Sequence, residues 1–590
     1  MVLARIDNIS YPDRTLLLPN TVFRMNYLDW LVLFGTILFI AGYGALKTTG
    51  HKNIEGYLKG DNSLKWWMIG ISIMATQASA VTFLSVPGQA IEDGMRFIQF
   101  YFGLPLAMVI VSVTMVPIYY RLKVYTAYEY LETRFDLKTR SLAAVLFLML
   151  RGLSAGISLF APALILSTIL RWPLTLTTII IGSLVIFYVV SGGSRAVSLT
   201  QRYQMAIIMG GMILAGILAF NLLPEGVSFG DSVNIAGELG KFNLINLEFD
   251  ITDRFNIWSG LIAGTFLQLS YFGTDQSQVG RYLGGTSATE SKLGLMFNGL
   301  LKIPMQFLIL FIGVLVYVFY LFNQPPVFHN QVLTERVMKT EQADVLRGIE
   351  KEYNTLYVEK RQAVDELVDA IHEKNDGAIE RSRDKVLDLS GHESKLRDSV
   401  KATIAKALPN AKTQDRDYIF LNFVLSNLPH GIIGLLLAVM FSAAMSSMAS
   451  ELNALASTTC VDIYKRNITR DADALHYVKA SKLFTILWAV LAMVFAMLAS
   501  FAENLIQFVN IVGSLFYGTI LGIFLAAFYV KRVHGTAVFW AALLAQAIIF
   551  YCYMFTDIAF LLYNIIGCAV VILFSLLLQM MLPKNIPLKQ

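Results

Sequence analysis

Long apolar runs repeat along most of this sequence, and each has the length of a membrane-crossing helix. A run of about 20 apolar residues spans a hydrocarbon core about 30 Å thick. Inside lipid, a helix satisfies its backbone hydrogen-bonding groups within one segment, so we assign all of these runs as helices. Hydrophobic residues make up 56% of the 590 residues and charged residues only 15%, which excludes an ordinary soluble domain. The sequence therefore predicts an all-α integral membrane protein.

About thirteen runs qualify as transmembrane helices by hydropathy. They lie at 27–46, 66–90, 97–120, 142–170, 173–191, 203–223, 256–280, 295–322, 421–450, 480–501, 504–530, 536–556 and 558–582. Residues 1–26 are polar and show no cleavable signal pattern. We expect the first run to remain in the protein as an anchor.

Cations gather in alternate short loops and fix a predicted orientation. They are Lys47, Lys52, Lys59, Lys65, Arg121, Lys123, Arg134, Lys138, Arg140, Arg195, Arg202, Lys465, Arg466, Lys531, Arg532 and Lys584. The positive-inside rule places these loops in the cytoplasm. Because an odd number of spans separates the two ends, we expect the N-terminus outside, the C-terminus in the cytoplasm, and the protein in the cell (plasma or inner) membrane. The net charge of +5 points to no particular partner, and we expect no nucleic-acid binding.

One segment departs from this pattern. Residues 331–417 are dense in both signs of charge, and two sets of apolar residues at helical spacing flank a break near Asn375. This pattern predicts a helical hairpin outside the membrane, stabilised by charge pairs one turn apart. It is either an inserted decoration or a domain that binds a protein partner.

Two of the predicted spans are rich in small and polar residues. The second reads MATQASAVTFLSVPGQA (Met74–Ala90) and the seventh FLQLSYFGTDQSQVGRYLGG (Phe266–Gly285). Many transporters consist of two inverted repeats whose first helices are interrupted at the midplane, where freed carbonyls can bind an ion. The two candidate breaks lie five helices apart, as such a repeat requires. For one break alone, close packing of small residues is the favoured explanation, but two at repeat positions favour a transporter.

The inverted repeat predicts a five-plus-five core and divides the chain into parts. These are an extracytoplasmic N-terminus (1–26), an extra helix and cytoplasmic loop (27–65), the first repeat (66–223), an outer loop (224–255), the second repeat (256–530) interrupted by an extracytoplasmic insertion (324–418), and two extra helices with a cytoplasmic C-terminus (531–590).

Several motifs follow one another in the order found in a known family. They are SAVTFLSVPG, YTAYEYLETRF (Tyr125–Phe135), GGSRAV (Gly192–Val197), TDQSQVGRYL (Thr274–Leu283) and SAAMSSMASELNALASTTCVDIYKR (Ser442–Arg466). The chain resembles the sodium:solute symporter family, in particular its branches for sialic acid and for monocarboxylates, vitamins and iodide. The resemblance implies sodium-coupled import of a small organic solute by alternating access. It implies no cofactor apart from sodium as the coupling ion.

The resemblance also implies a sodium site between the first broken helix and the eighth core helix. Matching the motifs places carbonyl ligands at Ala75 and Ala78 and, on the eighth helix, at Ala443. The Ser446 and Ser447 hydroxyls complete the set. Oxygen ligands suit a hard cation, although a serine pair in a membrane helix more often bonds to the preceding turn.

A second sodium site in some family members needs an aspartate in a T-D-x-x-Q pattern. Here that pattern reads Thr200-Gln201-Arg202-Tyr203-Gln204, and Ala449 replaces a further hydroxyl. Loss of an anionic ligand weakens cation binding, so we expect one sodium per cycle. A carbonyl oxygen of Gln201 could still serve as a ligand.

Arg151 lies deep in an apolar run, where a buried cation costs at least about 2.5–3.5 kcal/mol and should face a wet cavity or a partner. The sialic-acid members bind the substrate carboxylate with an arginine at the matching place. Arg151 is therefore predicted to bind a carboxylate such as that of a sialic acid or a monocarboxylate. The alternative is a structural pair with an acid such as Asp275.

Other substrate contacts are implied by the resemblance. They are Gln77, Ser79 and Thr82 on the broken helix, Gln268 on the sixth core helix, a Tyr271 gate towards the cytoplasm, and Tyr101, near the place of a glutamate that contacts sugars in the galactose carriers. The absence of that glutamate argues against a simple hexose. Lys302 matches a family lysine but could equally reach towards the interface. A symporter of neutral sugars or polyols remains the alternative.

Two other classes of protein are alternatives to a transporter: an enzyme, and an ion channel or membrane sensor. Gly152-Leu153-Ser154-Ala155-Gly156 satisfies the G-x-S-x-G pattern of hydrolases, but that motif requires a strand-turn-helix and an apposed histidine. The protein is therefore not expected to be an enzyme. An ion channel or membrane sensor remains the alternative from another class.

Overall fold

The computed structural model describes residues 25–47, 64–253, 255–409, 411, 413–499 and 505–582. Every regular element in these ranges is a helix. Nine helices in this part of the chain are long and apolar enough to cross a membrane, and the shorter apolar helices Tyr27–Ile40 and Leu174–Phe187 join them. The chain is thus a multi-pass α-helical membrane protein, whereas the total of thirteen spans stays a prediction.

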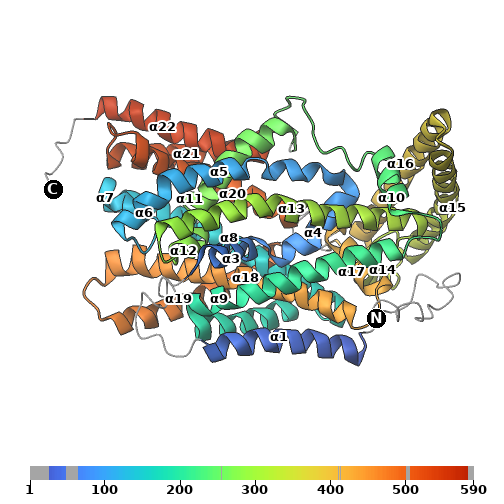
Figure 1. Ribbon diagram of the computed structural model, residues 1–590, viewed down its shortest axis with the longest axis horizontal. Helices are drawn as coiled ribbons and strands as arrows, with labels where there is room; N and C mark the ends of the chain where they lie inside the picture. The colour runs from blue at the N-terminus through green and yellow to red at the C-terminus, as the bar shows by residue number, and fades with distance from the viewer. Residues whose placement is uncertain are drawn as a thin grey trace.

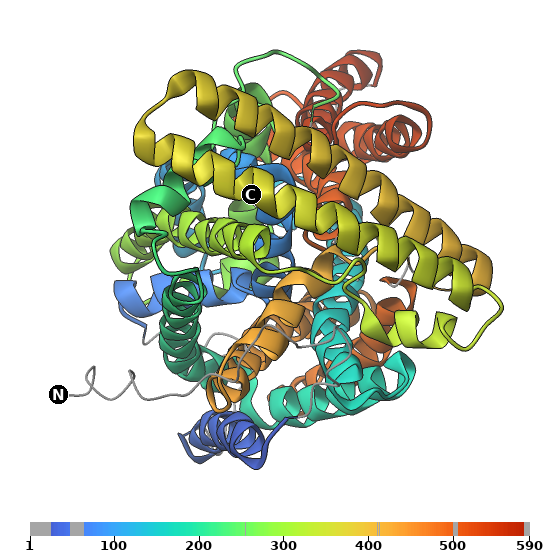
Figure 2. The same ribbon diagram turned by 90° about the vertical axis from the view of Figure 1, so that its right-hand side faces the viewer.

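The long helices lie side by side along one axis (Figure 1). They are α1 (Tyr27–Lys47), α8 (Leu137–Leu170), α9 (Leu174–Asn221), α13 (Ala288–Phe322), α18 (Ile432–Thr458), α19 (Ala474–Ala499), α20 (Leu505–Tyr529), α21 (Gly535–Phe555) and α22 (Tyr563–Met581). Both views place α1 on one side of the bundle and α21 with α22 on the opposite side (Figures 1 and 2).

The other elements connect, interrupt or cover these helices. They are α3 (Trp66–Gln77), α4 (Ala80–Asp93), η4 (Gly94–Tyr101), α5 (Leu104–Ile110), η5 (Val111–Met115), α6 (Val116–Leu122), α7 (Glu129–Arg134), α10 (Phe229–Glu238), η6 (Ser259–Ala263), α11 (Gly264–Gly273), α12 (Gln276–Tyr282), α14 (Gln331–Val337), α15 (Ala343–Glu373), α16 (Asp376–Ala407), α17 (Arg416–Asn427), η7 (Thr459–Ile468) and η8 (Phe560–Leu562).

The charged segment forms two long antiparallel helices, α15 and α16, that cross one end of the bundle (Figure 2). Lys374 adopts a left-handed conformation (φ 53°) at the end of α15. The Asn375 side chain then accepts a hydrogen bond from the Ala378 N–H and caps α16. Lys360 and Glu393 form an ion pair of 2.7 Å between the two helices.

The element α9 reverses its direction although its helical assignment is unbroken. Just before it, Arg171 pairs with Glu335 at the end of the bundle that α15 and α16 cover. Just after it, Asp231 pairs with His372 at the same end. A straight helix of 48 residues would extend about 72 Å and finish far from its start. The element therefore consists of two antiparallel limbs, where the sequence predicts two spans.

The predicted span at 421–450 is wrong in its bounds. The chain breaks between α17 and α18, where Pro429 precedes Gly431 with φ 88°. Proline lacks an N–H donor and a positive φ cannot continue a right-handed helix. The membrane helix consequently begins at Ile432, and α17 packs on α4 instead of extending α18.

The ends of the described chain lie at opposite ends of the bundle. Near the start of α1, the Asp29 carboxylate accepts a hydrogen bond of 2.6 Å from the Gly431 N–H, on the side of α15 and α16. Helix α22 finishes at the far end (Figure 1). Which end faces the cytoplasm stays a prediction. Residues 1–24 and 583–590 of the predicted termini, and 48–63 with Lys52 and Lys59, lie outside the described residues.

Both of the polar runs are interrupted helices. The first breaks at Ala78 and Ser79, whose ψ angles of 70° and 168° are not helical. The second breaks at Thr274 and Asp275, and the Asp275 side chain caps α12. These breaks bring non-helical backbone and polar side chains into the middle of an apolar bundle. Their relation by an inverted repeat remains a prediction.

Candidate functional site

A cavity lies beside the first break, between the interrupted helices and α8, α13, α18 and α20. Its walls are formed by Thr76, Gln77, Ser79, Val81, Thr82, Phe100, Tyr101, Arg151, Ser154, Ser158, Leu267, Gln268, Tyr271, Lys302, Ser447, Glu451, Ile506, Val509, Asn510, Gly513 and Tyr517. The structure thus brings together all six of the predicted substrate residues and the predicted gate. Most of these residues carry a polar group, and such groups on an otherwise apolar wall suit a small polar solute.

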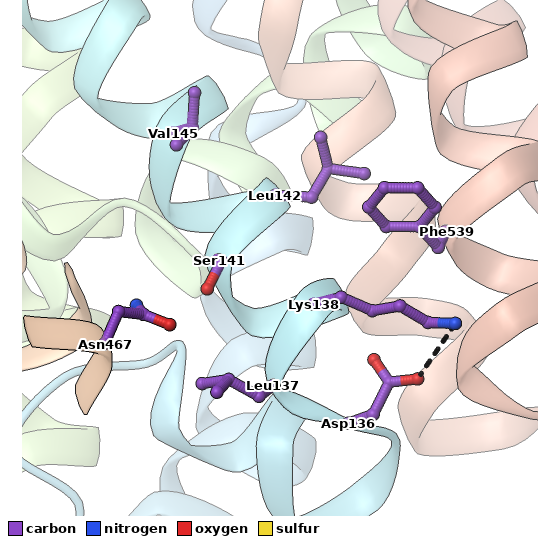
Figure 3. A pocket seen from close by; sticks show the side chains of 8 residues that line it. All are labelled: Asp136, Leu137, Lys138, Ser141, Leu142, Val145, Asn467 and Phe539. Carbon is purple, nitrogen blue, oxygen red and sulfur yellow. Dashed lines mark ion pairs between the residues drawn. The ribbon is translucent and has the colours of Figure 1, made fainter.

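A second pocket contains none of the predicted site residues. It opens at the start of α8 and is lined by Asp136, Leu137, Lys138, Ser141, Leu142, Val145, Asn467 and Phe539 (Figure 3). Its walls are largely aliphatic and aromatic, and its Lys138 and Asp136 side chains pair with each other (Figure 3). Nothing at this pocket converges on a ligand.

One contact joins the predicted sodium ligands of α3 and α18, and another lies within α18. Ser446 Oγ donates a hydrogen bond of 3.2 Å to the Ala75 carbonyl oxygen. Ser447 Oγ lies one turn from the Ala443 carbonyl, to which it donates at 3.1 Å, and Ser447 also lines the cavity. Ala78, at the break itself, is fully buried. Hydroxyl and carbonyl oxygens of this kind are ligands that a hard cation accepts.

Gln201 occupies the place of the missing aspartate and is fully buried. Its Oε1 accepts a hydrogen bond of 2.5 Å from Ser72 Oγ. Its Nε2 donates to Ser446 Oγ at 3.0 Å and to Ser450 Oγ at 3.2 Å. The amide therefore presents a donor, not an oxygen ligand, to the serines of α18.

Arg151 is held by protein acids. Its Nε and Nη2 donate to the same Asp275 oxygen at 2.8 and 2.5 Å, and its Nη1 donates to Glu451 at 3.0 Å. Nη2 also reaches the Tyr517 hydroxyl at 2.6 Å. The guanidinium further stacks over the Tyr271 ring, 5.1 Å from its centre. Of the two roles predicted for Arg151, this geometry favours the structural pair with Asp275.

Lys302 is the opposite case. It comes from α13, its exposed fraction is 1%, and it lines the cavity. In the part of the chain that the structure describes, its ammonium forms no ion pair or hydrogen bond, and its partner is the Tyr101 ring, 5.6 Å away. A buried cation without an acid is costly unless a ligand or water meets it. Lys302 is thus an available cation in the cavity wall.

The remaining predicted residues hold the cavity wall together. Gln77 Nε2 donates to the Asn298 side chain at 3.2 Å, and Thr82 Oγ1 donates to the Gln77 carbonyl at 3.3 Å. The Tyr271 hydroxyl accepts a hydrogen bond of 2.6 Å from Gln278. Gln268 is 4% exposed and forms part of the wall.

Sequence reasoning missed Glu451 and Tyr517. Glu451 stands in the serine-rich motif on α18, and an acid within a membrane helix is by itself a signal for a functional site. Tyr517 gives no such signal because aromatic residues in membrane helices commonly pack. Only the arrangement of α20 against α11 shows that its hydroxyl joins the Arg151 cluster.

Comparison with known proteins gives one family and several relatives. The model of the sodium:solute symporter family matches residues 57–346 and 400–545. The human sodium/iodide cotransporter is 29% identical over 273 residues, which are 46% of this chain and 42% of that protein. The human sodium-coupled monocarboxylate transporter 1 is 31% identical over 273 residues, 46% of this chain and 44% of that protein. The matched stretch thus spans less than half the length of these relatives.

A solved structure shows the same fold. It is that of a Na+-coupled sialic acid symporter in a substrate-bound outward-open state. The TM-score is 0.72, the sequence identity is 21%, and the match covers 95% of this chain and 98% of that protein. Residues 347–399, which form most of α15 and α16, lie outside the family match.

Proposed function

Because the chain belongs to the sodium:solute symporter family, we propose that it is a sodium-coupled symporter of a small organic solute that carries a carboxylate. Import proceeds by alternating access across the cell membrane, with one sodium ion per cycle. The resemblance drawn from the motifs is confirmed by the family match. The family and the relatives are sodium transporters and not enzymes.

The sodium site is supported above all by the contact between Ser446 Oγ and the Ala75 carbonyl oxygen. This contact joins α18 to the end of α3 where the first helix is interrupted. A sodium ion between the two groups would replace one hydrogen bond by two oxygen ligands, and Ser447 and Ala443 offer more. Sodium binding would thereby hold the broken helix against α18.

One sodium per cycle follows from the Gln201 amide. Its Nε2 carries hydrogens with partial positive charge towards Ser446, at 3.0 Å. A second cation there would meet these hydrogens and find no carboxylate. The Oε1 atom accepts a hydrogen bond from Ser72, so the carbonyl oxygen is turned towards α3 and the Nε2 group towards the serines of α18.

A carboxylate-bearing cargo is supported by Lys302 and no longer by Arg151. The three nitrogens of the Arg151 guanidinium already donate to Asp275, Glu451 and Tyr517. Lys302 faces the same cavity without an acidic partner in the described chain. A cargo carboxylate beside it would remove the cost of an uncompensated buried charge. Tyr271 would then close the cavity towards the cytoplasm.

The orientation is also part of the proposal. With the basic loops in the cytoplasm, α15 and α16 stand outside the cell and cover the outer end of the bundle (Figure 2). Their contacts with α10, such as that of His372 Nε2 with Asp231 at 3.2 Å, attach them to the bundle. A protein partner could meet their exposed faces.

Selective stabilisation by sodium tests the proposed site. Thermal unfolding of the purified protein is compared in sodium chloride and in potassium chloride of equal concentration. A ligand at about 100 times its Kd stabilises a protein by about 2.7 kcal/mol, so sodium should raise the unfolding temperature and potassium should not. Equal unfolding temperatures in the two salts at saturating concentrations would contradict the proposal.

A further inference from the structure

One cation and two acids cluster at the cavity: Arg151 and Glu451 belong to its wall, and Asp275 bonds to Arg151. Arg151 pairs with Asp275 at 2.5 Å and with Glu451 at 3.0 Å. The three side chains are 6%, 0% and 8% exposed. A buried charge is stable only when an opposite charge and hydrogen bonds compensate it. One guanidinium balances one carboxylate, so this cluster lacks one positive charge.

The two acids differ in how well they are satisfied. Asp275 Oδ1 accepts hydrogen bonds from the Ser277 N–H and hydroxyl, and Oδ2 accepts from Arg151 and Tyr517. Glu451 Oε1 accepts from Arg151. No described donor bonds Glu451 Oε2 with hydrogen-bond geometry, although the Ser158 hydroxyl lies beside the carboxylate. Glu451 shares Arg151 with Asp275 and is therefore the acid that is less fully compensated, and it lines the cavity.

The charges that face Glu451 come from several elements. Arg151 reaches it from α8, Asp275 from the break after α11, and Tyr271 from α11, whereas the Tyr517 hydroxyl on α20 contacts Arg151 and Asp275. The Tyr271 and Tyr517 rings lie 5.9 Å apart between their centres. Aromatic faces attract cations. A further cation beside Glu451 would thus meet a carboxylate in a cavity whose wall also contains the Tyr271 and Tyr517 rings.

Lys302 places a positive charge in the wall of the same cavity. It comes from α13, whereas Glu451 comes from α18, and both side chains belong to the cavity wall. Its ammonium faces the Tyr101 ring and has no acid among the described residues. One cavity therefore contains an acid that shares its arginine with a second acid and a cation that has no acid among the described residues.

We propose that Glu451 binds an ammonium group of the transported solute while Lys302 binds its carboxylate, so that the cargo is a small zwitterion of the amino-acid class. This inference rests on the proposed symport and names its substrate class. Such a cargo brings one charge of each sign into the cavity and compensates both Glu451 and Lys302. A simple monocarboxylate would compensate Lys302 only.

Sets of three analogues with the same side chain test this assignment. Each set consists of an amino acid, the 2-hydroxy acid in which a hydroxyl replaces the ammonium, and the amide in which the carboxylate is lost; alanine, lactate and alaninamide form one set. Binding is measured as the shift in thermal unfolding of the purified full-length protein in sodium chloride. At least one amino acid should bind at least about tenfold more tightly than its hydroxy acid and its amide.

Variants distinguish the role of Glu451 from that of Lys302. Glu451→Gln should remove the preference for the amino acid over the hydroxy acid, and Glu451→Asp should keep the preference with weaker binding. Lys302→Gln should weaken the amino acid and the hydroxy acid alike. Glu335→Gln, an exposed acid on α14 paired with Arg171 outside the cavity, should leave the order of the three analogues unchanged.

Three results would overturn the assignment. The first is that no amino acid binds, and the second is that the wild type binds the amino acid and its hydroxy acid equally tightly. The third is that Glu451→Gln binds the three analogues in the same order of affinity as the wild type and changes only the sodium midpoint. The stabilisation by sodium shows that each variant is folded. Loss of the sodium response in the wild type with amino-acid binding intact would contradict the symport and not the ammonium site.

Discussion

Ser446 Oγ donates a hydrogen bond of 3.2 Å to the carbonyl oxygen of Ala75. The two residues stand 371 positions apart in the chain, and the contact ties the interrupted first helix to α18. Both residues are fully buried. The same two oxygens are proposed to bind sodium, so an ion there would control how the broken helix rests on α18.

Removal of the Ser446 hydroxyl tests that coupling. Ser446→Ala deletes one proposed oxygen ligand, and the sodium concentration for half-maximal stabilisation should rise about tenfold, which corresponds to about 1.4 kcal/mol. Ser457→Ala is the matched control, because Ser457 is a buried serine on the same helix that bonds only to the Ala454 carbonyl. An identical sodium midpoint in Ser446→Ala and Ser457→Ala would exclude Ser446 as a ligand.

A carboxylate at position 201 should create a second cation site. Gln201→Asp replaces the donor that faces Ser446 and Ser450 by an acceptor. A sodium titration of the wild type should give a Hill coefficient of about one, and the variant should give a larger value or a tighter midpoint. A wild-type coefficient clearly above one would contradict the single sodium ion.

Arg151 should matter for stability as well as for transport. Arg151→Gln leaves Asp275 and Glu451 buried without their cation, and breaking a buried pair in this way costs about 3–5 kcal/mol. The unfolding temperature should therefore fall markedly, and the double variant Arg151→Gln/Asp275→Asn should recover part of the loss. If Arg151→Gln unfolds at the wild-type temperature but binds solute more weakly, Arg151 binds the cargo directly.

Acid should loosen the pair of helices that covers the end of the bundle. Burial raises the pKa of Glu393, but Lys360 and Arg397 beside it bring that pKa below its ordinary value of 4.5. A carboxyl with a lowered pKa stabilises the folded state above pH 4.5, and this contribution is lost as the pH falls through the lowered value. Hydrogen-exchange protection of α15 and α16 should then fall relative to that of α8.

Glu393→Gln controls for this effect. The variant lacks the titrating group, so the protection of α15 and α16 should be lower at neutral pH and should change less with acid. Wild-type protection that stays constant relative to α8 well below pH 4.5 would refute a contribution from this ion pair.

The sequence predicted the helices and the two breaks because both depend on local properties. Apolar length determines which segments enter lipid, and the small polar residues around Ala78 and Thr274 disfavour an uninterrupted apolar helix there. The bounds of one span were wrong because Pro429 and Gly431 end a helix within an otherwise apolar stretch. The motif positions placed Gln201 and Ser446 at two separate sodium sites, whereas the fold brings the two side chains into contact at 3.0 Å.

The charges of the cavity could not be predicted in the same way. Arg151 was visible as a cation in an apolar run, but its partners Asp275 and Glu451 lie 124 and 300 positions away. Which acid reaches an arginine depends on helix packing and not on local spacing. The free state of Lys302 likewise follows only from the absence of an acid nearby in the described structure.

Uptake into proteoliposomes under an imposed inward sodium gradient tests the symport most directly. Labelled amino acids and labelled monocarboxylates are offered to vesicles that contain wild-type protein or the Ser446→Ala/Ser447→Ala variant. At least one of these solutes should accumulate above its external concentration with sodium outside, and should only equilibrate with potassium outside or with the variant. Accumulation of none of these solutes, or equal accumulation with sodium and with potassium, would contradict sodium-coupled symport.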